Sequence, residues 1–208
     1  GIPTGGPSRQ NPFLDLLRFT RAPVEEEIVF RIIPIGIFLV TYIYFSGRRL
    51  KPDFSWWTRL KISLLSVFQP EEAKKKVGLR TIRSHGLLDG IVWAEWIIVI
   101  LTSFLFGVAH YFGGWGPGKI SQATLSGAVF AIAYLYYGIQ APILLHWQFN
   151  YYFTVFELSS EYYFHQIDLL SMSWAANIFL GTMMCIMLGV FGVFTILGIL
   201  RGKRGVEQ

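Results

Sequence analysis

Three short polar clusters interrupt apolar stretches of the sequence and carry the side chains that could do chemistry. Glu26 and Glu27 lie in APVEEEIVFR, His110 ends FGVAH, and His146 lies in HWQFN together with Asn150. A carboxylate can act as a general base on water, and His and Asn side chains can hold that water or donate hydrogen bonds to a developing oxyanion. Together these residue types predict a hydrolytic site.

Helical spacing separates the roles of neighbouring residues in these clusters. Glu27 and Arg31 are four residues apart, with the acid on the N-terminal side, which is the favourable orientation for an ion pair. Glu26 lies about 100° around the helix from Glu27, so one carboxylate can be held by Arg31 while its neighbour points elsewhere. His146 and Asn150 are also four residues apart and share one helix face.

Each cluster also has a structural interpretation. Pro23 suits the first turn of a helix, where the acidic residues after it would favour the helix dipole. His110 could be a packed or interfacial residue, and His146 with Asn150 could join two helices by hydrogen bonds. Ionisable groups inside membrane helices are costly, however, so the joint occurrence of the three clusters favours a functional site.

The segments that carry these clusters predict a membrane protein. Hydrophobic residues make up 53% of the 208 residues and charged residues only 15%, whereas a soluble domain carries about 25% charged residues. This composition excludes disordered and collagen-like chains. Because lipid favours helices over open strands and no alternating barrel pattern occurs, we expect an all-α, polytopic helical membrane bundle. The sequence predicts about five transmembrane helices, at roughly 24–46, 90–112, 119–137, 139–157 and 174–200.

The basic residues indicate membrane orientation. The net charge is +5; ten of the 18 Lys and Arg lie within 47–85, and three more lie within 201–204. The positive-inside rule therefore places the 47–90 linker and the C-terminus in the cytoplasm of a multi-pass protein, in the cell membrane or an endomembrane. Membrane lipids account for the basic run more simply than nucleic acid does, so no nucleic-acid partner is expected. FSWWTRLKISLLSVF in this linker predicts an interfacial helix.

Taken in order, the motifs EExxxR, FxxxH and HxxxN resemble those of a known family. APVEEEIVFR, SFLFGVAH and PILLHWQFN are similar to the motifs of the CAAX prenyl protease and bacteriocin-processing family (CPBP, or Abi) of intramembrane glutamyl proteases. The resemblance covers residues 22–157. It implies a single membrane-embedded domain over 1–208, from which the N-terminal helices usual in the family are missing.

The resemblance also implies a mechanism and a set of site residues. The expected activity is that of an intramembrane endopeptidase, which hydrolyses a peptide bond of a membrane-associated or lipidated substrate by glutamate-activated water, without a cofactor. Glu26 would be the catalytic carboxylate, and His146 with Asn150 would stabilise the oxyanion. The implied catalytic residues are Glu26, His110, His146 and Asn150, and the implied orienting pair is Glu27 and Arg31.

Three alternatives remain open. Zinc held by Glu26, His110 and His146 would support the same hydrolysis, although no HExxH occurs. A non-catalytic scaffold or a subunit of a larger membrane complex would use the small residues of the third and fifth segments as packing faces. A proton relay would use Glu95, which the protease motifs leave unassigned. The distances among the four implied catalytic residues bear most directly on this choice.

Overall fold

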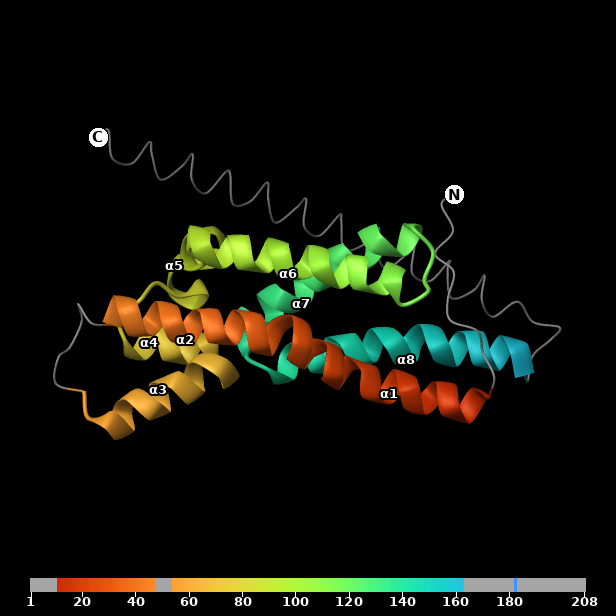
Figure 1. Ribbon diagram of the computed structural model, residues 1–208, viewed down its shortest axis with the longest axis horizontal. Helices are drawn as coiled ribbons and strands as arrows, with labels where there is room; N and C mark the ends of the chain where they lie inside the picture. Colours follow the sequence, from red (N-terminus) through yellow and green to blue (C-terminus); the bar gives the residue numbers. More distant parts are fainter. Residues whose placement is uncertain (1–10, 48–53, 163–181, 183–208) are drawn as a thin grey trace, which may run out of the picture. The chain divides into compact units, whose positions relative to one another are not determined.

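Every regular element in the described part of the chain is a helix (Figure 1). The computed structural model describes residues 11–47, 54–162 and 182, and no strand occurs within these residues. The expected all-α class is therefore confirmed for this part. By its contacts the chain divides into two units, Gly1–Tyr151 and Tyr152–Gln208, and every candidate site residue belongs to the first unit. The single domain expected over 1–208 stays a prediction.

The first motif lies on a long helical stretch made of three elements. α1 (Pro12–Glu27) leads into a π-helical turn, η1 (Ile28–Ile32), and α2 (Ile33–Gly47) continues from it. The side chain of Asn11 caps the start of α1 by accepting two backbone N–H groups, as a good N-cap residue does. The acidic motif therefore lies within a helical stretch that begins well before it.

The interpretation of Pro23 as a first-turn residue is wrong. Pro23 lies inside α1, and the helix begins at Pro12 instead. Asn11 followed by Pro12 is the stronger start, because the cap satisfies free N–H groups and the proline has none to lose. The glutamates after Pro23 consequently do not serve the dipole of a helix that begins there.

Three short helices fill the basic linker. They are α3 (Trp56–Phe68), α4 (Pro70–Lys76) and α5 (Ile82–Gly90). α3 confirms the helix expected in FSWWTRLKISLLSVF, and its buried Ile62 packs with Ile43 of α2. Its place at a membrane surface stays a prediction.

The second and third motifs lie on long helices. α6 (Trp93–Phe112) and α7 (Gly118–Tyr137) pack closely against each other, and α8 (Gln140–Tyr162) follows. A Cβ at Gly107 would lie 2.5 Å from the carbonyl oxygen of Ile120, so the close approach of α6 and α7 requires glycine there. Small residues allow helices in membranes to approach in this way.

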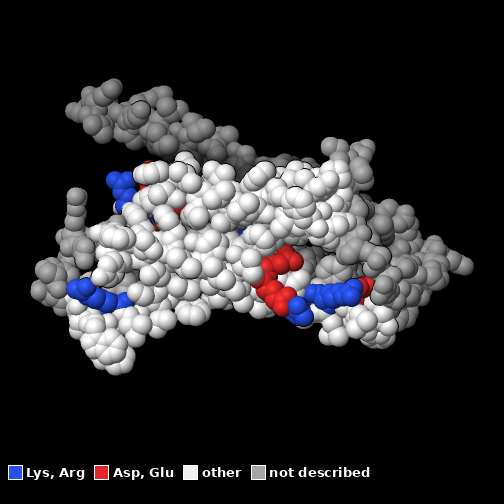
Figure 2. All heavy atoms as spheres, in the orientation of Figure 1, with Lys and Arg blue, Asp and Glu red and all other residues white. Residues whose placement is uncertain are grey.

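Two stretches of the described chain are long and apolar enough to cross a membrane. They are Phe13–Phe45, in which an 18-residue window has a mean hydropathy of 2.1, and Trp93–Phe112, in which such a window has 1.6. Figure 2 shows that most of the visible surface of the described residues carries no charged side chain. The third and fourth expected segments fall on α7 and α8, whereas 174–200 lies outside the described residues except for Thr182. Five spans, and the cytoplasmic placement of the linker and the C-terminus, stay predictions.

Glu95, considered above for a proton relay, has structural partners. Its buried carboxylate accepts hydrogen bonds from Lys74 Nζ at 2.9 Å and from the backbone N–H of Val92 at 2.8 Å. Lys74 also donates to the carbonyl oxygen of Gly90 at 2.7 Å. A buried charge is normally paired in this way. These contacts fasten α4 to the start of α6 and account for Glu95 without a transport role.

Candidate active site

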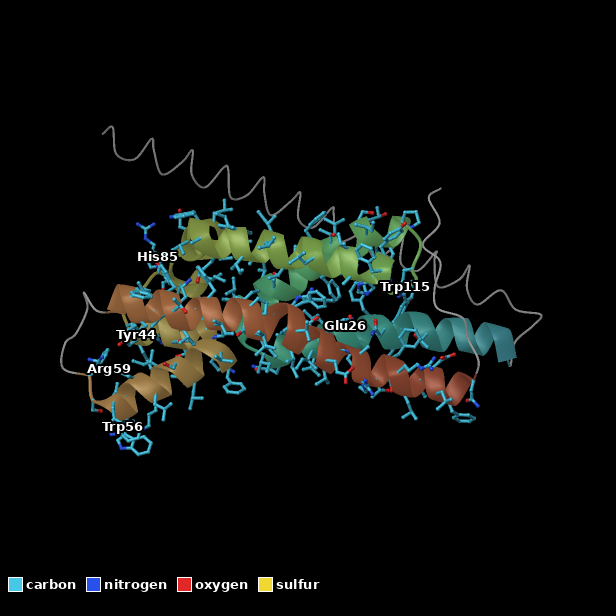
Figure 3. All side chains as sticks on the ribbon, in the orientation of Figure 1. Glu26, Tyr44, Trp56, Arg59, His85 and Trp115 are labelled. Carbon is cyan, nitrogen blue, oxygen red and sulfur yellow. The ribbon has the colours of Figure 1, made fainter. Side chains whose placement is uncertain are left out.

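Glu26 lies beside both histidines of the later motifs. Its Oε2 atom is 3.6 Å from His146 Nε2 and 3.9 Å from His110 Nε2. The Glu26 side chain is 31% exposed as a whole, although its Oε2 atom is buried, and the two histidines are more buried than Glu26. Figure 3 labels Glu26 near the end of α1. The three motifs thus bring one carboxylate and two imidazole rings together.

Glu27 is fully buried and makes a different set of contacts. Its Oε1 atom accepts hydrogen bonds from Arg31 at 3.1 Å and from His146 Nδ1 at 2.8 Å. The Glu27–Arg31 ion pair expected from the spacing is therefore present. The contact with His146 was not expected from the sequence, since it joins residues that are far apart along the chain.

A widened helical turn, η1, begins directly after Glu27 and contains Arg31. In η1, the backbone N–H of Ile33 donates to the carbonyl oxygen of Ile28, five residues earlier. Single π-helical turns within α-helices are frequent at functional sites. The residue pattern of IVFRI contains no signal for this turn.

Arg31 is held between two aromatic rings. Its guanidinium carbon lies 4.0 Å from the centroid of Phe106 and 5.6 Å from that of Phe130. Aromatic faces attract cations, most strongly where water is excluded. A Cβ at Gly127 would lie 2.8 Å from an Arg31 nitrogen. The buried guanidinium therefore needs both the aromatic rings and the absence of a side chain at Gly127.

The same two phenylalanines position the histidines. Phe130 stacks on His146 with centroids 5.0 Å apart. Phe106 forms T-shaped ring pairs with His146 and His110, with centroids 5.7 Å and 4.5 Å apart. The sequence alone indicated no role for either phenylalanine. The FxxxH spacing could have identified Phe106, because residues four apart are neighbours on a helix. No comparable local signal points to Phe130.

The hydrogen bonds at Nδ1 define which nitrogen of each histidine faces Glu26. His110 Nδ1 lies 2.9 Å from the carbonyl oxygen of Phe106, which can only accept. His146 Nδ1 lies 2.8 Å from the Glu27 carboxylate, which accepts in its ionised form. Both rings therefore carry a proton on Nδ1. In a neutral ring Nε2 is then an acceptor, and it becomes a donor only when the ring is protonated.

Several buried polar atoms of this cluster have unused hydrogen-bonding capacity within the described part of the chain. They are Glu26 Oε2, Glu27 Oε2, Arg31 Nε and one terminal nitrogen of Arg31. Buried polar atoms are normally satisfied, and exceptions call for an explanation. Glu26 Oε2 also faces both histidines, so it is the atom best placed to bind a water molecule.

Asn150 is less closely tied to this cluster. It lies one helical turn after His146 on α8 and is half-buried. Among the described residues, its side chain forms no hydrogen bond with the other candidate residues. The geometry therefore brings together Glu26, His110 and His146, and none of their polar contacts in the described residues involves Asn150.

In the described ranges, no group of three or more His, Cys, Asp or Glu is arranged to hold a metal ion.

Comparison with known proteins matches residues 9–152 to one family model, described as type II CAAX prenyl endopeptidase Rce1-like. The matched range contains all three motifs and every residue of the cluster described above. No curated protein and no solved structure matches the chain.

Proposed function

Because the chain belongs to the Rce1-like family of type II CAAX prenyl endopeptidases, we propose that it hydrolyses a peptide bond of a membrane-associated substrate with water that Glu26 activates. The observation that carries the proposal is the meeting of Glu26 with His110 and His146 inside the matched range. The family and the two apolar helices indicate a membrane protein. We further propose that it is multi-pass, with the 47–90 linker in the cytoplasm.

In the proposed first step, a water molecule binds between Glu26 Oε2 and His110 Nε2. Glu26 accepts a proton from this water, and the resulting hydroxide attacks the carbonyl carbon of the substrate peptide bond. The proton on Glu26 then passes to the leaving amine as the carbon–nitrogen bond breaks. A glutamate that accepts and returns one proton in this way is a general acid–base catalyst.

In the same proposal, His146 donates a hydrogen bond from Nε2 to the developing oxyanion. Because Nδ1 already donates to Glu27, this requires a protonated ring. The buried Glu27 carboxylate would stabilise that imidazolium, as the buried aspartate does in serine protease triads. Arg31 would hold the Glu27 carboxylate in position, and Asn150 would supply a second donor once substrate is bound.

His146→Ala is expected to lower kcat by about 10²–10³-fold, which is the usual cost of losing one oxyanion donor. The measurement is cleavage of a prenylated CAAX-type peptide by the purified full-length protein. His85 is a matched control, since it is exposed on α5 and labelled in Figure 3 away from Glu26. His85→Ala is expected to retain the activity. Undiminished cleavage by His146→Ala would contradict the assigned role.

The proposal requires no metal, whereas the zinc alternative would use Glu26, His110 and His146 as ligands. We expect a chelator to leave peptide cleavage unchanged, and metal analysis of the active protein to find no stoichiometric zinc. A zinc peptidase treated in parallel checks that the chelator works. Activity that is lost on chelation and restored by zinc would instead establish the metal mechanism.

A further inference from the structure

The ammonium group of Lys119 lies near the candidate site and has no carboxylate within 4 Å in the described part of the chain. Its Nζ atom lies 4.4 Å from the ring centroid of Trp115, and both side chains are half-buried. The more deeply buried cations differ from it, because Arg31 pairs with Glu27 and Lys74 pairs with Glu95. A partly buried cation that lacks such a partner is well suited to bind an anionic group from outside the chain.

The short turn between α6 and α7 places Lys119 beside the site. The backbone N–H of Trp115 donates to the carbonyl oxygen of His110 at 3.2 Å, and the rings of these two residues lie 6.2 Å apart. Lys119 follows within the first turn of α7, and its charge attracts the Glu26 carboxylate. Figure 3 labels both Trp115 and Glu26. An anion held by Lys119 would therefore lie close to the bond that Glu26 is proposed to cleave.

The CAAX substrates after which the matched family is described carry such an anion. A CAAX sequence lies at the C-terminus of its protein, so the chain ends in a free α-carboxylate only a few residues after the prenylated cysteine. We propose that Lys119 binds this terminal carboxylate and that the Trp115 ring holds the ammonium in position. This inference rests on the proposed function. It makes Lys119 a specificity-determining residue that selects substrates by their free C-terminus.

The test compares two prenylated CAAX-type peptides that are identical except that one ends in a carboxylate and the other in an amide. The wild-type, full-length protein is expected to prefer the acid by about 10- to 100-fold in kcat/KM, as for a charge-assisted hydrogen bond. Lys119→Met is expected to lose this preference through a raised KM for the acid, so that the acid and the amide are cleaved with similar kcat/KM. Lys119→Arg keeps the charge and is expected to retain the preference.

The possible outcomes separate this inference from the proposed function. If the wild-type protein cleaves both peptides equally well, the role of Lys119 is overturned while the endopeptidase activity stands. The same conclusion follows if Lys119→Met loses activity on both peptides equally, because that indicates a structural role. If the wild-type protein cleaves neither peptide, the proposed function is overturned, and this inference with it.

Discussion

Glu26→Gln is expected to lower kcat for peptide cleavage by about 10²–10⁴-fold, the usual contribution of a general base. Glutamine has the shape of glutamate and can still bind water, but it cannot accept the proton. Because Glu26 is partly exposed and pairs with no guanidinium within the described residues, the folded structure should tolerate the change. The measurement is the cleavage rate of a prenylated CAAX-type peptide by the purified full-length protein.

Glu25 is a matched control for this experiment. It precedes Glu26 directly, but its side chain is exposed and pairs with Arg21 at 2.7 Å. Glu25→Gln removes the same charge from the same helix and should leave the cleavage rate near that of the wild type. Full activity in Glu26→Gln, or an equal loss in Glu25→Gln, would contradict the assignment of Glu26 as the base.

Arg31→Met is expected to lower the free energy of unfolding by about 3–5 kcal/mol, because removing one partner of a buried ion pair leaves the other charge uncompensated. Arg31 and Glu27 are both fully buried, and the Arg31 guanidinium lies over the Phe106 ring. Methionine would restore neither the charge nor the hydrogen bond to Glu27. The loss is measured by unfolding the purified protein in detergent, with either rising temperature or rising denaturant concentration.

The exposed pair between Arg21 and Glu25 provides the control, since both residues of that pair are accessible to water. Arg21→Met should change the stability little, because surface ion pairs contribute little. The double variant Glu27→Gln with Arg31→Met removes both buried charges and should be more stable than Arg31→Met alone. If Arg31→Met proves as stable as Arg21→Met, the buried pair does not support the fold.

Much of the helical structure could be predicted because it depends on local properties. Apolar runs of sufficient length indicated helices, since a backbone in an apolar environment must satisfy its own hydrogen bonds. The Glu27–Arg31 ion pair followed from a spacing of four residues. The start of the first helix was predicted wrongly, because Pro23 is compatible with a first turn and Asn11–Pro12 is the stronger signal for one.

The same local reasoning was incomplete within the third motif. Spacing placed His146 and Asn150 on one helix face, and the structure has them one turn apart on α8. Of these two residues, only His146 has a polar contact with Glu26 and with Glu27 among the described residues. Sharing a helix face is necessary for two residues to meet at one site, but the neighbouring helices determine how far along that face the site extends.

The sequence by itself determined the helices, the polar residues within them and the different directions of Glu26 and Glu27. These properties depend on backbone hydrogen bonding and on the helical repeat, which are encoded over a few residues. Only the tertiary structure decided that Glu27 binds His146, that Phe106 and Phe130 enclose Arg31, and that Gly127 makes room for it. These contacts join helices that are distant in the sequence, so they depend on how side chains of different helices fill the same space.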